Sequence, residues 1–200
     1  SGVDQVMVTI LNCIENCTNG IDDDGDGLVD CADPDCSGVT APVLANDEYS
    51  TCPGMTYSNR VTYNDGNLNN PLFSITANPT HGTVTIDWTG KFVYVPNSFE
   101  CATDVFTYQV CNQSSGCCAE ATVTITLGDN TPPVLTNVPA DLTLSCDDEI
   151  PSPPTVTGFD NCPGIFMEFD ETSSQNFVGA CGSYTITRTW TATDFCGNVA

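Results

Sequence analysis

The fold is decided by residues 104–127, DVFTYQVCNQSSGCCAEATVTITL. Both outer parts of this stretch alternate apolar with polar residues and are rich in Val, Thr, Ile and Tyr, which is the pattern of half-buried β-strands. The middle part, residues 111–118, is a cluster of turn-forming residues. The stretch therefore predicts a β-hairpin whose two strands each present one face to a core.

The same strand pattern recurs along the chain on both sides of this hairpin. It is seen in MVTI (7–10), TVTIDW (83–88), FVYV (92–95), DLTLSC (141–146) and YTITRTW (184–190), with Gly-, Pro- and Asn-rich turns between them. No stretch shows a sustained helical period. Short, regularly spaced strands with such turns predict an all-β protein built from tandem β-sandwiches.

Changes in composition divide the chain into four zones. Residues 1–12 form one strand, and residues 13–40 are rich in Asp and Cys with almost no apolar periodicity. Residues 41–129 hold a complete set of strands. Residues 130–200 begin a second set after the Pro-rich junction TPP at 131–133. We expect two sandwiches, at 41–129 and 130–200, preceded by an acidic loop.

The second sandwich is predicted to lack its last strand. YTITRTWTATD (184–194) leads into the turn FCGN and then only Val199 and Ala200, whereas SGVDQVMVTIL (1–11) is a strand with no domain of its own. Read from end to start, the two pieces form a hairpin in which Val6, Val8 and Ile10 share one face. We therefore expect residues 1–12 to complete the C-terminal sandwich of the preceding unit.

Two physical forms of this head-to-tail arrangement stay open. The units can be copies within one covalent tandem array, or separate subunits that each donate a strand to a neighbour. Either form gives an open linear homopolymer, because a heterologous contact that does not close continues indefinitely. The alternative is that the 200 residues are a truncated piece with a frayed end.

The charge of the chain is strongly one-sided. Asp and Glu number 26 against 3 Lys and Arg, which gives a formal net charge of −23. Such a chain repels nucleic acid and anionic membrane surfaces, and no apolar run is long enough to span a bilayer. It also repels itself, so bound cations would help it to fold. Acidity that serves only solubility is the alternative explanation.

The strongest motif is an acidic loop within CTNGIDDDGDGLVDCADPDC, residues 17–36. Its spacing matches positions 1, 3, 5, 7, 9 and 12 of an EF-hand calcium loop, filled by Asp22, Asp24, Asp26, Leu28, Asp30 and Asp33. Gly27 takes the sharp turn at position 6, and Leu28 would contribute its backbone carbonyl. Asp33 stands where an EF-hand has a bidentate Glu, and flanking helices are absent. We predict that these six residues bind Ca²⁺; a solvated acidic linker is the alternative.

The 13 cysteines indicate disulfides formed in an oxidising compartment. No C-x-x-C occurs and His81 is the only histidine, so zinc sites are not expected. We expect Cys111 to pair with Cys117 or Cys118 across the hairpin turn. Further expected pairings are Cys52 with Cys101, two bonds among residues 13, 17, 31 and 36, and two among residues 146, 162, 181 and 196. One of Cys117 and Cys118 would be left free or would cross-link neighbouring units.

Catalytic motifs are missing from the sequence. No nucleophile signature surrounds a Ser or Cys, no Gly-rich phosphate loop occurs, and acidic pairs such as Asp147–Asp148 arise by chance in so acidic a chain. We therefore predict that the protein is not an enzyme.

Several segments resemble repeats of secreted bacterial surface proteins. NGIDDDGDGLVDCADPDC is similar to thrombospondin type 3 calcium repeats and to calcium motifs of large bacterial surface proteins. ANPTHGTVTIDWTGKFVYVPNSFE and DVFTYQVCN resemble the cadherin-like or Ig-like repeats of adhesins. TPPVLTNVPADLTLSCDDEIPSPPTVTGFDNCP and TITRTWTATDFCGN resemble the hyalin-repeat (HYR) Ig-like module. The resemblance implies an extracellular or cell-surface location, two Ig-like or cadherin-like sandwiches and no catalytic residues.

These observations predict a structural unit of an extracellular fibre, assembled head to tail and rigidified by calcium and disulfides. Two other functions remain open: a stalk repeat of a large calcium-dependent bacterial adhesin, and a non-catalytic accessory module of a secreted enzyme. A surface or glycan ligand is conceivable for the adhesin, but no residue pattern identifies one.

Overall fold

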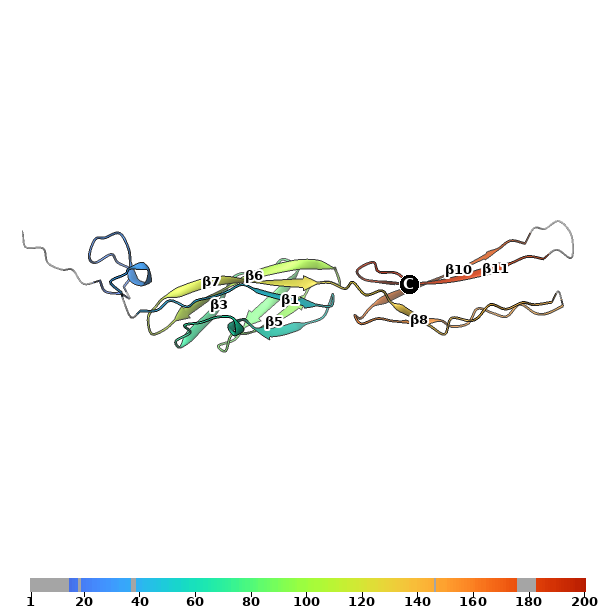
Figure 1. Ribbon diagram of the computed structural model, residues 1–200, viewed down its shortest axis with the longest axis horizontal. Coiled ribbons are helices and arrows are strands. Elements are labelled where there is room, and N and C mark those ends of the chain that lie inside the picture. Colours follow the sequence, from blue (N-terminus) through green and yellow to red (C-terminus); the bar gives the residue numbers. More distant parts are fainter. Residues whose placement is uncertain (1–14, 18, 37–38, 146, 176–182) are drawn as a thin grey trace, which may run out of the picture. The chain divides into compact units, whose positions relative to one another are not determined.

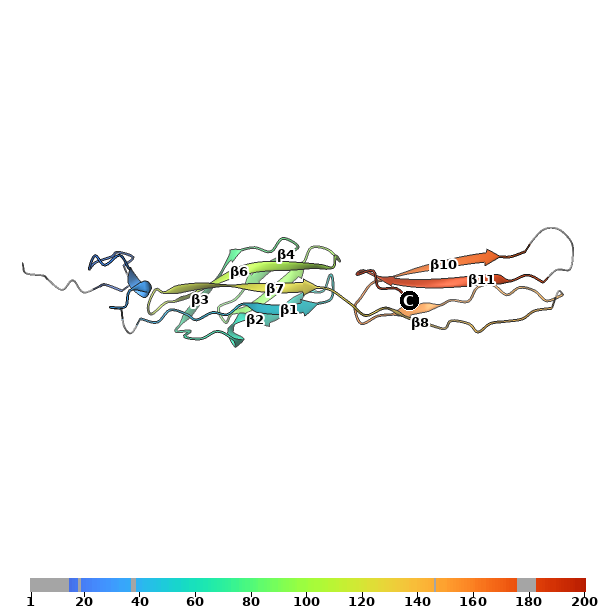
Figure 2. The same ribbon diagram turned by 45° about the horizontal axis from the view of Figure 1, so that its top comes forward.

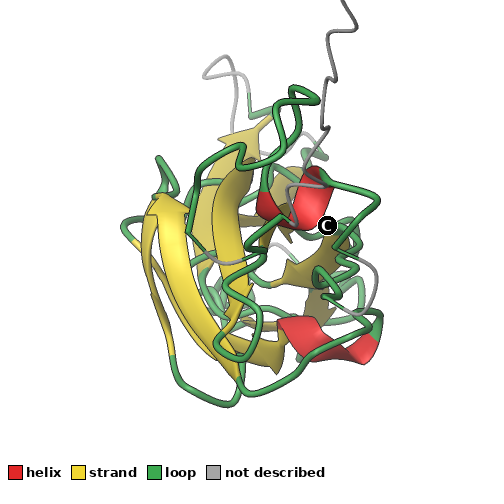
Figure 3. Cartoon of the chain, turned by 90° about the vertical axis from the view of Figure 1, so that its left-hand side faces the viewer, coloured by secondary structure: helices red, strands yellow, loops and turns green. Residues whose placement is uncertain are grey.

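The computed structural model describes residues 15–17, 19–36, 39–145, 147–175 and 183–200. The predicted N-terminal strand and Cys13, Cys146 and Cys181 lie outside these residues. Within them the secondary structure consists of β-strands and two single 3-10 turns, η1 (Asp30–Ala32) and η2 (Val61–Tyr63) (Figure 3). The all-β prediction is confirmed. Contacts divide the chain into two compact units, which are described separately.

The first unit comprises the described residues within Ser1–Glu48, together with Tyr57–Tyr94 and Val105–Thr124. Its strands belong to two sheets of a sandwich. One sheet has the order β1-β7-β6-β3 and the other the order β2-β5-β4. The bounds are β1 Asp47–Thr51, β2 Tyr57–Arg60, β3 Pro71–Ala77, β4 Gly82–Ile86, β5 Lys91–Pro96, β6 Ala102–Asn112 and β7 Cys118–Leu127. One end of each of β1, β5, β6 and β7 lies in segments assigned to the second unit.

The predicted hairpin is formed by β6 and β7, which lie side by side (Figure 1). The two strands contribute side chains to the core at alternate positions. Every second residue of β6 from Asp104 to Asn112 is buried, and burial alternates along β7 in the same way. Phe92 and Phe106 meet edge to face with ring centroids 5.4 Å apart. Each such fully buried aromatic side chain stabilises the fold by about 1.5–3 kcal/mol.

A buried polar network closes one side of this core. The hydroxyl of Tyr108, which has no exposed surface, donates a hydrogen bond of 3.0 Å to Asp65 Oδ2. Burial, followed by the negative charge of Asp65 and the hydrogen bond to it, raises the pKa of Tyr108 far above its ordinary value. The hydroxyl therefore stays protonated and donates to the carboxylate at all physiological pH values.

The second unit comprises Tyr49–Thr56, Val95–Asp104 and Ile125–Ala200. Two short ladders dominate it: β8 (Val134–Thr136) with β9 (Thr157–Phe159), and β10 (Ile165–Ser173) with β11 (Ile186–Asp194). Figure 2 shows β10 and β11 running side by side. Every residue of β11 has a partner in β10, from Ile186 opposite Ser173 to Asp194 opposite Ile165.

Two disulfides tie the second unit together, and they correct the predicted pairings. Cys52 bonds to Cys162 and Cys101 bonds to Cys196, so neither the Cys52–Cys101 pair nor two bonds within residues 130–200 are formed. Beside them the Phe99 and Phe195 rings stack with centroids 4.7 Å apart. The prediction failed because it assumed that each stretch of strands closes its own disulfides.

The disulfide of the β6–β7 hairpin is one of the two alternatives predicted, in which Cys111 pairs with Cys117 or with Cys118. Cys111 bonds to Cys118 across the β6–β7 turn. Cys117 is not left over, as expected, but bonds to Cys31 in the acidic loop. Cys17 bonds to Cys36, so the loop is closed on itself once and is tied once to the sandwich.

Candidate metal centre

The acidic loop is shaped by carboxylates that bond to backbone amides a few residues ahead. Asp24 Oδ1 accepts from Asp26 N at 3.0 Å, and Asp26 Oδ1 accepts from Leu28 N at 2.8 Å. Asp22 accepts from the amides of Gly25 and Gly27 at 2.6 and 3.0 Å. The bonds of Asp24 and Asp26 form Asx-type turns, which Asp favours because its short side chain reaches the amide two residues on. The bonds of Asp22 reach amides three and five residues on. The chain therefore reverses direction repeatedly and gathers its carboxylates.

Glycine permits the sharpest of these reversals. Gly25 and Gly27 have φ angles of +82° and +94°, and a Cβ at either position would meet no atom within 4 Å. The constraint is therefore the backbone conformation rather than crowding, since L-residues with a side chain rarely adopt such angles. Gly27 occupies the predicted position 6 of the loop.

Two groups of three carboxylates converge within the loop. The first is Glu15, Asp22 and Asp24, and the second is Asp24, Asp26 and Asp33; in each, one oxygen per residue lies within 4.8 Å of the others. Asp33 is only 5% exposed, and its Oδ2 accepts no hydrogen bond. Four of the six predicted ligands, Asp22, Asp24, Asp26 and Asp33, are thus brought together.

Asp30, another predicted ligand, is placed differently. Its carboxylate accepts hydrogen bonds from Asn19 N at 3.0 Å and Gly20 N at 2.9 Å, and it belongs to neither group. Leu28 lies between Asp26 and Asp33 in the sequence, and its predicted carbonyl ligand stays a prediction. Asp30 therefore holds the start of the loop in place through two amides.

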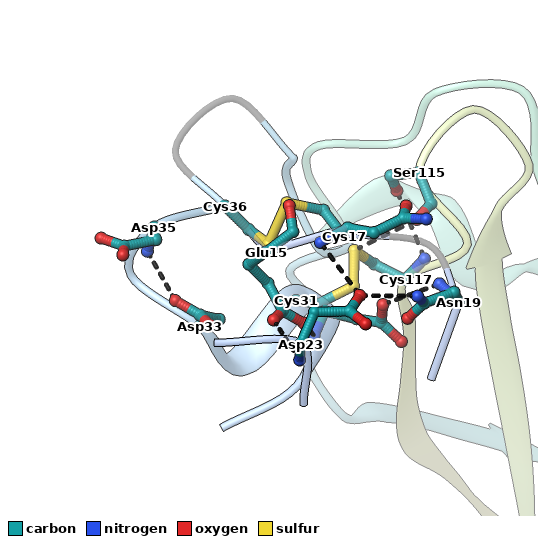
Figure 4. Close-up of a disulfide and its surroundings, with 12 residues drawn as sticks. Glu15, Cys17, Asn19, Asp23, Cys31, Asp33, Asp35, Cys36, Ser115 and Cys117 are labelled. Carbon is teal, nitrogen blue, oxygen red and sulfur yellow. Dashed lines mark hydrogen bonds between the residues drawn. A yellow bond between two sulfur atoms is a disulfide. The ribbon is translucent and has the colours of Figure 1, made fainter. Parts of the chain in front are cut away.

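Glu15 is a member that sequence reasoning missed. It is 5% exposed and accepts from Asp23 N at 2.9 Å and from Asp30 N at 3.3 Å. In the sequence, Glu15 is marked only as an acidic residue two positions before Cys17. It lies outside the twelve residues that match the calcium-loop spacing. The Cys17–Cys36 bond brings that upstream segment back against the loop, as Figure 4 shows.

The electrostatics of the loop require a positive partner. Residues 15–36 contain eight carboxylates and no Lys, Arg or His. Two full charges separated by 4.8 Å repel each other by roughly 3 kcal/mol at an effective dielectric constant of 20. Hard oxygen ligands in a flexible loop are the donor set that suits Ca²⁺. The chemistry of the residues therefore fits a bound calcium ion.

The loop is fastened to the sandwich at the β6–β7 turn. The Cys31–Cys117 bond reaches that turn, where Cys117 N donates to Ser115 Oγ at 3.3 Å (Figure 4). Asn112, which is fully buried, donates from Nδ2 to Thr40 O at 3.0 Å. A cation in the loop would consequently act on the end of the central hairpin.

Comparison with known proteins supports the fold of the first unit. Residues 39–126 match the sequence profile of the family described as bacterial Ig domain. This segment is therefore similar to bacterial Ig domains. This similarity and the disulfides indicate an extracellular or surface location. No helix in the described part of the chain is long and apolar enough to cross a bilayer.

Solved cadherin structures are also similar to the chain. Extracellular cadherin domains 1–4 of protocadherin gamma B7 share 16% identity over 77% of this chain and 46% of that one, with a TM-score of 0.31. Drosophila N-cadherin EC1-4 shares 16% identity over 81% of this chain and 40% of that one, with a TM-score of 0.36. The chain spans less than half the length of either. No curated protein sequence matches the chain.

Proposed function

We propose that this protein is a structural, non-catalytic unit of an extracellular bacterial fibre, in which residues 1–12 of one unit add a strand to β11 of the preceding unit. The observation that carries the proposal is the outer edge of β11. Its inner edge is fully paired with β10, whereas its outer edge begins a ladder that is only partly filled by the described residues.

The start of that ladder is formed by the residues after the turn that follows β11. Ala192 and Ala200 exchange two backbone hydrogen bonds of 3.0 Å, and Asp194 N donates to Asn198 O at 3.1 Å. Thr193 and Val199 face each other in an antiparallel bridge. No described strand pairs with residues 186–191 on this side. Such an exposed edge is a template for a further strand.

Continuing the ladder fixes the register of an incoming strand. If Ser1 of the next unit follows Ala200, the pairs are Ser1–Thr191, Gly2–Trp190, Asp4–Arg188 and Val6–Ile186. Residues directly opposite one another share a face, so Gly2, Asp4 and Val6 lie on the side of the buried Ala192. Asp4 then lies opposite Arg188, one of only three basic residues in the chain.

Exposed apolar side chains of the second unit offer a surface for that strand. On the side of Ala192, Met167 and Phe169 remain 40% and 46% exposed, although the Phe169 ring contacts Trp190 at 5.2 Å. Leu142 and Ile150 are 65% and 46% exposed. Apolar residues at alternate positions of the donated strand, such as Val6 and Val8, would remove such surface from water.

The acidic loop, as a proposed calcium site, fits the same role. The loop directly follows the donated strand in sequence, and Cys31–Cys117 fastens it to the sandwich. A filled loop held by Asp22, Asp24, Asp26 and Asp33 would stiffen the connection between one unit and the next. The proposed metal is Ca²⁺, and the thrombospondin-like and HYR-like resemblances remain predictions.

The strand register is tested by an engineered disulfide. Gln5 and Thr187 are opposite each other in the proposed ladder, and Thr187 is exposed. Their pair lies between hydrogen-bonded pairs, where Cα atoms are about 4.5 Å apart and a disulfide can form. Gln5→Cys with Thr187→Cys should give a ladder of multimers on a non-reducing gel. Each single variant, and Gln5→Cys with Thr191→Cys, should resemble the wild type. A ladder from the out-of-register pair alone would reject the register.

The second candidate function is a stalk repeat in a larger adhesin, which the Ig-like repeat favours. Boiling native material in detergent and reductant separates the two cases. A band near 21.2 kDa indicates separate subunits that exchange strands, and a very large band indicates a covalent array.

A further inference from the structure

We propose that Asp129, Asp160 and Asp194 form a second divalent-cation site of the calcium class, and that the Cys52–Cys162 and Cys101–Cys196 disulfides are thermodynamically linked to it. The inference is independent of strand exchange. The three residues come from three segments of the second unit: the stretch after β7, the loop after β9, and the end of β11.

The three carboxylates converge on one point. One oxygen from each lies within 4.8 Å of the other two. Asp129 is 9% exposed and Asp194 is 5% exposed. These two residues also border a small depression lined by Pro53, Cys162 and Phe195. Asp129 and Asp194 are therefore largely shielded from water, and Asp160 is partly exposed.

Two carboxylate oxygens of this cluster have no hydrogen-bond partner. Oδ2 of Asp129 and Oδ2 of Asp160 are both buried and accept no hydrogen bond. The companion Oδ1 of Asp129 accepts from Thr131 N at 2.9 Å and from Asn161 Nδ2 at 3.2 Å, which fixes the carboxylate in its orientation. Burying a carboxylate oxygen without a partner is unfavourable, and a bound cation would compensate for this cost.

The second unit itself offers no free cationic side chain for this cluster. Arg188 is the only Lys, Arg or His in the sequence of the second unit. Its guanidinium donates to Glu171 at 2.6 Å and to Pro151 O at 2.8 Å. The charge that neutralises the cluster must therefore come from solution.

The donor set selects the class of that cation. The cluster contains hard carboxylate oxygens and no imidazole, which disfavours zinc and favours Ca²⁺ or Mg²⁺. The oxygens come from three separate segments, which suits the flexible coordination of Ca²⁺ better than the strict octahedron of Mg²⁺. We therefore assign the calcium class.

The two disulfides hold the carboxylates in position. Asp160 is two residues before Cys162, and Asp194 is two residues before Cys196. Asp129 N lies 3.2 Å from Cys196 Sγ, to which it donates, and Asn161 Nδ2 donates to both Asp129 Oδ1 and Cys162 Sγ. Opening either disulfide would release a ligand segment. By reciprocity, a bound cation must stabilise the disulfide-bonded state.

The site is tested by calorimetric titration of the full chain with Ca²⁺ after chelator treatment. The variant Asp160→Asn should lose calcium binding at the Asp129–Asp160–Asp194 cluster and keep calcium binding in the acidic loop. The variant Asp24→Asn should lose binding in the acidic loop and keep binding at the cluster. Asp170→Asn removes an exposed carboxylate of β10 and should titrate like the wild type. If Asp160→Asn also titrates like the wild type, or if it raises stability equally with and without Ca²⁺, the site does not exist. Equal affinity for Mg²⁺ would overturn the calcium assignment.

The linkage is tested by equilibrating the protein in mixtures of reduced and oxidised dithiothreitol and measuring the open fraction of Cys52–Cys162 by alkylation and mass spectrometry. Calcium should lower the equilibrium constant for opening on the order of tenfold in the wild type and in Asp24→Asn. It should have no effect in Asp160→Asn. Equal open fractions in calcium and in chelator for the wild type would overturn the linkage. Neither assay depends on multimers, so failure here is distinguishable from failure of the fibre proposal.

Discussion

Thr193 and Val199 lie opposite each other in an antiparallel bridge on the outer edge of β11. The bridge lies next to residues 186–191, whose backbone groups on this edge pair with no described strand. It therefore defines both the direction and the register of any strand that extends the sheet. The proposed pairing of Asp4 with Arg188 is the one obtained when a donated strand continues this register.

Reversing the charge at Asp4 should weaken assembly. Asp4→Lys places a second positive charge opposite Arg188, and opposed charges across a ladder change stability by about 0.2–1 kcal/mol per pair. Sedimentation should show a lower assembled fraction at equal protein concentration. Combining Asp4→Lys with Arg188→Glu should restore part of the assembled fraction. The recovery is partial because the new Glu at position 188 lies opposite Glu171 in the β10–β11 ladder. Lys91→Glu, at the exposed start of β5, serves as the charge control and should leave assembly unchanged. Equal assembly of all variants would speak against the register.

Removing calcium should destabilise the protein through the acidic loop. A ligand present at 100 times its dissociation constant stabilises the folded state by about 2.7 kcal/mol, so a chelator should lower the melting temperature by several degrees. Asp24 belongs to both carboxylate groups of the loop, and Asp24→Asn should reduce this shift. Asp170→Asn should retain it. Identical melting curves with and without chelator would exclude the metal site.

Loss of the Cys31–Cys117 bond should uncouple the loop from the sandwich. The bond spans 86 residues, for which the chain-entropy relation gives about 4.6 kcal/mol, against about 2.4 kcal/mol for the 7-residue span of Cys111–Cys118. Replacing both cysteines of a pair by Ser should therefore destabilise the protein more for the first pair. Denaturant unfolding measures the difference. A larger loss for the Cys111–Cys118 pair would contradict the assignment.

Tyr108 should make the protein sensitive to alkaline pH. Its folded pKa is raised, by burial first and then by the charge of Asp65, so its contribution to stability is complete below the unfolded pKa of about 10. Above that pH the unfolded chain releases the proton while the folded chain keeps it, and stability falls. At pH 7, Tyr108→Phe should cost about 1.5–3 kcal/mol, the value of a hydrogen bond to a charged group. The gap between variant and wild type should shrink above pH 10. A constant gap from pH 7 to 11 would refute this account.

Much of the fold could be predicted from the sequence because strand periodicity is a local property. The alternation in residues 104–127 predicted the β6–β7 hairpin, and the disulfide between Cys111 and Cys118 follows from two cysteines that flank one turn. The aspartate spacing likewise reflects local turn geometry. It brought Asp22, Asp24, Asp26 and Asp33 into two overlapping groups.

What the sequence could not supply are contacts between segments far apart in the chain. Cys52 and Cys162 are separated by 110 residues, and no local pattern marks them as partners. Glu15 joins the loop only because the Cys17–Cys36 bond folds the upstream chain back. The carboxylate of Asp30 matches the EF-hand spacing, but it bonds to the amides of Asn19 and Gly20. Spacing alone does not reveal such competition from backbone donors.

The most direct measurement of strand exchange is an electron cryomicroscopy map of the assembled material. The account predicts filaments in which a strand from the next unit runs antiparallel to β11, with Asp4 beside Arg188 and Val6 beside Ile186. A map in which residues 1–12 pack within their own unit, or in which the outer edge of residues 186–191 faces solvent inside an intact filament, would contradict it.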